Sequence, residues 1–66
     1  MMITNFEKIG KSTYQAIALD GCKENEIIIK KNENTFMWDT FINGIYKHSH
    51  EGLKWAKVWL MTMQGV

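Results

Sequence analysis

The chain has 66 residues, eight lysines and seven acids, which gives it a net charge of +1 at neutral pH. This length supports one domain at most, over residues 1–66, and a single cysteine excludes an internal disulfide. A lone thiol is typical of a reducing compartment, so we expect a cytoplasmic location. The balanced charge and the absence of arginine argue against sequence-specific DNA binding, and no stretch is long and apolar enough to predict a membrane span.

The first half of the chain has the pattern of β-structure. Residues Thr13–Leu19 alternate between two faces, and Glu26–Lys31 contains three successive isoleucines, which predicts a strand covered on both faces. Asp20-Gly21 marks a turn between them, which Lys23–Asn25 is expected to lengthen. An earlier strand at Ile3–Ile9 would complete a three-stranded meander, although a short helix over the same residues is the alternative.

The second half, Thr35 to Val66, is predicted to be helical. Its apolar and small residues recur at the helical step and share one side. These are Trp38, Phe41, Ile42, Ile45, Ser49, Gly52, Leu53, Ala56, Trp59, Leu60 and Met63. The stripe keeps its phase across Ser49–Gly52, which favours one long or kinked helix. Two helices with a break at Ser49, or a strand over Lys54–Met63, remain alternatives. The expected fold is therefore α+β: a small antiparallel meander or hairpin followed by a long C-terminal helix.

Two short motifs resemble catalytic or metal-binding patterns. Gly10-Lys11-Ser12-Thr13 resembles the end of a phosphate-binding loop, but the required glycine five positions earlier is Asn5, which favours a simple turn. His48-Ser49-His50-Glu51 resembles a metal site, but residues two apart diverge on a helix and could not share one ion. We therefore expect no catalytic residue, no cofactor and no metal.

The candidate partner-binding residues lie along one flank of the predicted helix. On a continuous helix, His48, Gly52, Trp55 and Trp59 form a line beside the apolar stripe. Tryptophan is enriched among the residues that dominate protein interfaces, although a pair of core tryptophans would give the same pattern. The line therefore predicts contact with another protein.

The sequence thus predicts a small, non-catalytic protein-binding module. We expect an inhibitor or adaptor of phage or mobile-element type, whose partner is a host protein or a second copy of the chain. The alternative is a small DNA-binding regulator of strand–helix–helix type, built from Glu26–Lys31, Thr35–His48 and Ser49–Met63.

Overall fold

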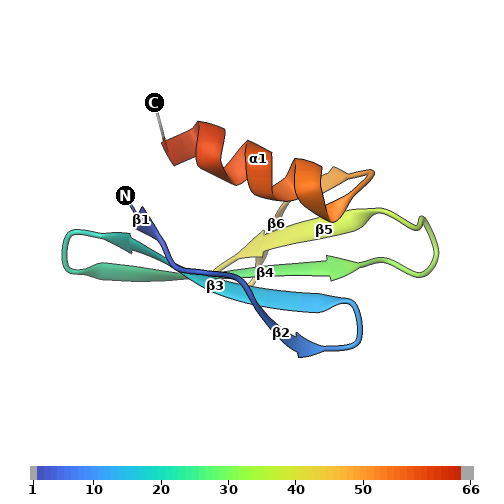
Figure 1. Cartoon of the computed structure of the whole chain (residues 1–66), viewed down its shortest axis with the longest axis horizontal. Coiled ribbons are helices and arrows are strands. Elements are labelled where there is room, and N and C mark those ends of the chain that lie inside the picture. The colour runs from blue at the N-terminus through green and yellow to red at the C-terminus, as the bar shows by residue number, and fades with distance from the viewer. Residues whose placement is uncertain (1, 65–66) are drawn as a thin grey trace.

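A computed structural model describes residues 2–64 as one antiparallel sheet with a helix on one face (Figure 1). The elements follow one another along the chain in simple order. They are β1 (Met2–Ile3), β2 (Glu7–Gly10), β3 (Thr13–Asp20), β4 (Lys23–Lys31), β5 (Trp38–Ile42), β6 (Ile45–His50) and α1 (Leu53–Gln64). Strands β3 to β6 lie side by side in sequence order. Both β1 and β2 pair with the outer edge of β3, at its two ends.

Tight turns explain why consecutive strands pair directly. The β3–β4 hairpin is in register from Thr13–Lys30 to Asp20–Lys23, so its loop has only two residues, Gly21 and Cys22. The β5–β6 loop is Asn43-Gly44, and both residues have positive φ, 54° and 82°. Positive φ at both central residues is the signature of the type I′ turn, whose twist matches that of paired strands.

The core lies between the sheet and α1. The side chains that are almost completely buried come from the two central strands and the inner side of the helix: Ala16, Ala18, Ile27, Ile29, Ala56 and Leu60. Small alanines on β3 face isoleucines on β4, since Ala16 pairs with Ile27 across the strands. We infer that the alanines leave room for the helix to approach the sheet closely. Partly buried Ile3, Phe6, Trp38, Ile42, Leu53 and Trp59 surround this centre.

The opposite face of the sheet is not covered by any element within residues 2–64. Alternation along the strands places Ile17, Ile28 and Phe41 on this open face, where all three are only half-buried. A polar network lies beside them: Ser49 Oγ donates to Asp39 Oδ1 at 2.6 Å and lies 2.7 Å from the Tyr46 hydroxyl. The molecule is therefore a two-layer fold with one apolar interface and one mixed, solvent-facing surface.

The predicted fold class is wrong for the second half of the chain. Residues 38–50, expected to be helical, form the β5–β6 hairpin, and the helix begins only at Leu53. The predicted end of the helix at Val66 lies outside the described residues. The sheet therefore has six strands within residues 2–64, instead of a hairpin or three-stranded meander before a long helix.

Two smaller expectations for the first half also differ from the structure. The triple isoleucine is covered on one face only, since Ile27 and Ile29 are buried while Ile28 lies on the open face. Lys23–Asn25 belongs to β4 and does not lengthen the turn. Within residues 2–64, no helix is both long enough and apolar enough to span a bilayer.

Candidate functional site

The four predicted partner-binding residues meet at the corner where β6 leads into α1, but they do not form one line. His48 belongs to β6, Gly52 to the connection, and the two tryptophans to the helix. The rings of His48 and Trp59 lie 5.4 Å apart, and Gly52 accepts a hydrogen bond from the backbone of Trp55 at 3.1 Å. Trp55 and Trp59 point differently: Trp59 packs against the core, whereas 58% of Trp55 is exposed.

His48, His50 and Trp59 form an aromatic cluster at this corner. Because the two histidines lie on a strand, they share a face, and their rings stack with centroids 4.5 Å apart. Ring centroids of His50 and Trp59 are 5.6 Å apart. Burial lowers the pKa of His50, and the neighbouring His48 lowers it further. The prediction that the side chains of His48 and His50 diverge assumed a helix and is therefore wrong.

His48 and His50 are the two possible metal ligands in this cluster. Among the residues that the structure describes, no three or more His, Cys, Asp or Glu side chains gather closely enough to hold an ion. The Nδ1 atom of His48 lies 2.8 Å from the carbonyl oxygen of Ser49. The rings of His48 and His50 on β6 pack against Trp59 on α1.

The outer surface of α1, defined here by Trp55, Val58 and Met61, exposes three large apolar side chains. These residues are spaced by three, so they lie near one another on the side away from the sheet. Their exposed fractions are 58%, 42% and 66%. The ammonium group of Lys54 lies 5.8 Å from the centre of the Trp55 ring, and α1 carries no acidic residue. This surface is thus apolar and basic.

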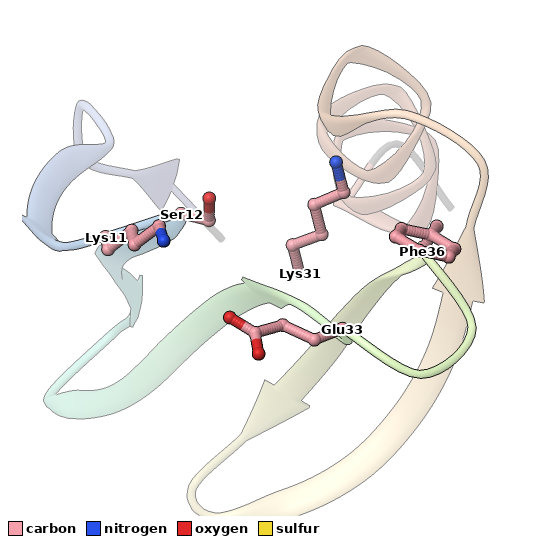
Figure 2. A pocket seen from close by; sticks show the side chains of 5 residues that line it. All are labelled: Lys11, Ser12, Lys31, Glu33 and Phe36. Atoms are coloured by element: carbon pink, nitrogen blue, oxygen red, sulfur yellow. The ribbon is translucent and has the colours of Figure 1, made fainter.

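A second candidate site is a pocket between two loops at one end of the sheet (Figure 2). Its volume is about 380 Å³, and it is lined by Lys11, Ser12, Lys31, Glu33 and Phe36. Lys11 and Ser12 form the β2–β3 turn, and the other three residues come from the end of β4 and the loop after it. The backbone N–H of Lys31 donates to the Ser12 carbonyl at 3.0 Å and ties the two loops together.

The β4–β5 loop owes its shape to Asn32. The Oδ1 atom of Asn32 accepts hydrogen bonds from the backbone N–H groups of Asn34 and Thr35, at 2.8 and 3.3 Å. Its backbone carbonyl accepts from the N–H of Phe36 at 2.7 Å. These bonds hold Phe36 at a φ of 59°, and 70% of its side chain is exposed. The loop therefore presents a large aromatic ring to solvent in a backbone conformation that costs energy.

Sequence reasoning missed this pocket because it placed Phe36 in the predicted helix and interpreted Lys11 only as a turn residue. The available signal was Asn32 followed by Asn34, since asparagine side chains often hold turns in this way. No family model matches the chain, and neither a curated protein nor a solved structure matches it. Its function must therefore be inferred from its own residues.

Proposed function

We propose that the chain is a small, non-catalytic protein-binding module whose outer surface of α1 docks onto another protein. The observation that carries this proposal is the exposure of Trp55, Val58 and Met61 on one side of a helix. An amphipathic helix that seats residues at such spacing in an apolar groove is a common mode of protein recognition. A tryptophan at the centre of such a contact commonly contributes more than its neighbours.

The charges on the helix favour a different protein over a second copy as the partner. Lys54 lies within this surface, and α1 has no acid to offset it. Lys57 adds a second cation at the edge, with its ammonium over the rings of Phe6 and Tyr14. Two copies that packed through this side would bring like charges together, which disfavours self-association. We propose a partner with an apolar groove rimmed by acidic residues. An inhibitor or adaptor of phage or mobile-element type, acting on a host protein, fits this chemistry.

The fold removes the reason for proposing a DNA-binding regulator of strand–helix–helix type. A strand–helix–helix regulator needs two consecutive helices, whereas residues 38–50 form a β-hairpin. No other observation on α1 favours duplex DNA over protein. We therefore retain the protein-binding proposal alone for this surface.

Affinity capture from the native host, followed by binding of the purified target, tests the proposal. We expect Trp55→Ala to lower the affinity about 30-fold, since an interface tryptophan commonly contributes about 2 kcal/mol. Ile9→Ala is the matched control, because Ile9 is an exposed apolar residue on β2. It should leave the affinity unchanged. Equal losses in the two variants, or a dimer dissociated by Trp55→Ala, would contradict the proposal.

The dependence of the complex's affinity on salt concentration is a second test of the proposal. An apolar interface with one or two lysines should weaken only slightly between low and moderate ionic strength. A complex with duplex DNA should weaken by orders of magnitude, because several counterions are released. A steep salt dependence of the captured complex would favour the nucleic-acid alternative.

A further inference from the structure

We propose that the pocket between the β2–β3 turn and the β4–β5 loop binds a nucleotide unit whose base carries an exocyclic amino group. The unit is either a free nucleotide or one residue of a single strand, since both present the same base and phosphate. This site is separate from the outer surface of α1 and does not depend on the function proposed for it.

Phe36 provides the first reason. A bulky residue with a φ of 59° is strained, and glycine or asparagine would occupy this backbone conformation more easily. Packing of the ring does not offset the energetic cost of this strain, since 70% of the residue is exposed. The Lys31 ammonium lies 5.9 Å from the ring centre. An exposed aromatic ring in a fixed loop is a stacking platform for a base.

The cations provide the second reason. Lys11 lies in the β2–β3 turn and Lys31 at the end of β4, and both line the pocket (Figure 2). The hydrogen bond from Lys31 N–H to the Ser12 carbonyl fixes how far apart these two segments lie. Two lysines and the hydroxyl of Ser12 can surround a phosphate group with charge and with a hydrogen-bond donor. The pocket therefore offers a phosphate-binding site between these two lysines, next to Phe36.

Glu33 provides the third reason and narrows the ligand class. Figure 2 shows its carboxylate extending across the pocket from the Phe36 side. A carboxylate accepts hydrogen bonds from an amino group, as from N4 of cytosine, and repels a carbonyl oxygen at the same position. A phosphorylated tyrosine has an aromatic ring and a phosphate but no such donor. The combination thus favours cytidine-, adenosine- or guanosine-type nucleotides, whose bases carry an exocyclic amino group, over uridine-type nucleotides and phosphotyrosine.

NMR titration of the full chain with cytidine and uridine monophosphates tests the specificity. We expect shifts for Lys11, Ser12, Lys31, Glu33 and Phe36, with cytidine monophosphate bound about tenfold more tightly than the uridine compound. Glu33→Gln should remove this preference, because an amide can also donate. Inorganic phosphate or phosphotyrosine bound as tightly as cytidine monophosphate would overturn the proposal, as would the absence of nucleotide binding.

Substitutions at Phe36 separate binding from folding. Phe36→Gly should keep or raise the melting temperature, since it relieves the strained φ, yet lower the affinity for cytidine monophosphate at least tenfold. Phe36→Tyr should retain the affinity, and Lys31→Met should weaken it while Lys54→Met on α1 does not. Unchanged affinity in Phe36→Gly would overturn the stacking role. A ten-nucleotide oligocytidine distinguishes the sources: tighter binding than the monophosphate assigns single-stranded nucleic acid, and equal binding assigns the free nucleotide.

Discussion

His50 shows how one residue connects packing to solution conditions. Its ring stacks on His48 and lies beside Trp59, where α1 meets β6. Its Nδ1 atom is buried and has no hydrogen-bond partner within residues 2–64. A buried nitrogen of this kind tolerates a neutral ring far better than a charged one. The pKa of His50 is therefore lowered from 6.5, chiefly by burial and secondarily by the charge of His48.

This shift predicts that the protein loses stability as the pH falls below about 6.5. Above that pH both folded and unfolded states keep His50 neutral. Below it the unfolded chain takes up a proton that the folded state resists, and the loss continues until the pH passes the lower folded-state pKa. Melting temperatures between about pH 7.5 and 5 should decline, and His50→Gln should flatten the decline. An unchanged slope in that variant would show that other groups cause it.

At the scale of elements, the β5–β6 hairpin depends on Asn43-Gly44. Gly44 has a φ of 82°, where a side chain is strained although nothing lies within 4 Å of a Cβ added there. Gly44→Ala should therefore lower the free energy of unfolding by about 1 kcal/mol or more through backbone strain alone. Gly10→Ala is the matched control, because a Cβ at Gly10 meets only ordinary contacts with Thr13, the nearest at 3.9 Å. Urea denaturation of both variants measures the difference, and equal losses would contradict it.

The same hairpin explains how far the sequence could predict the fold. Alternation correctly predicted a strand at Thr13–Leu19, and the run of three isoleucines correctly predicted one at Glu26–Lys31. In the structure these are Thr13–Asp20 and Lys23–Lys31, each with one apolar, buried face. In β5 the buried face is Trp38, Thr40 and Ile42, and the polar Thr40 hides the alternation. Phe41, on the open face, happens to fit a helical stripe instead. Asn43-Gly44 is the local sequence signal that favours a hairpin at this point.

The candidate sites were predictable to different degrees. Trp55 could be placed on an exposed helical flank because its local neighbours really are helical, from Leu53 onward. His48 could not, because its position relative to Trp59 depends on a strand that turns into the helix. Lys11 and Phe36 are far apart in sequence and meet only because the sheet brings two loops to the same end. Local sequence patterns cannot predict that residues so far apart in the chain lie close together.

At the scale of the whole molecule, the two sides of the sheet differ in charge. Alternation places four acids on the open face: Glu7, Glu24, Glu26 and Asp39. Lys30 lies on the same face, where it pairs with Asp39 across the strands. The helix on the other side carries Lys54 and Lys57 without acids. An acidic open face repels nucleic acid, so a nucleotide is better accommodated at the end of the sheet, and a basic helix suits an acidic protein partner. The two proposed sites thus occupy the parts of the surface whose charge fits their ligands.

The layering predicts that neighbouring isoleucines on β4 respond very differently to the same substitution. Ile27 lies beneath α1 with an exposed fraction of 1%, so Ile27→Asp places a charge where it is shielded from water. Such a charge costs several kcal/mol, comparable to the total of about 5 kcal/mol expected for a domain of this size, and should unfold the protein. Ile28 pairs with Gln15 and Phe41 on the open face, where an aspartate can turn toward solvent.

Ile28→Asp should therefore keep a cooperative thermal transition at a lowered temperature, whereas Ile27→Asp should show none by circular dichroism. Light scattering of both proteins provides the control, because a second copy or another layer over the open face would bury Ile28 as well. If both variants unfold and the wild type is larger than a monomer, the open face is an interface. The sheet would then be covered on both faces, by α1 on one face and by a partner on the other.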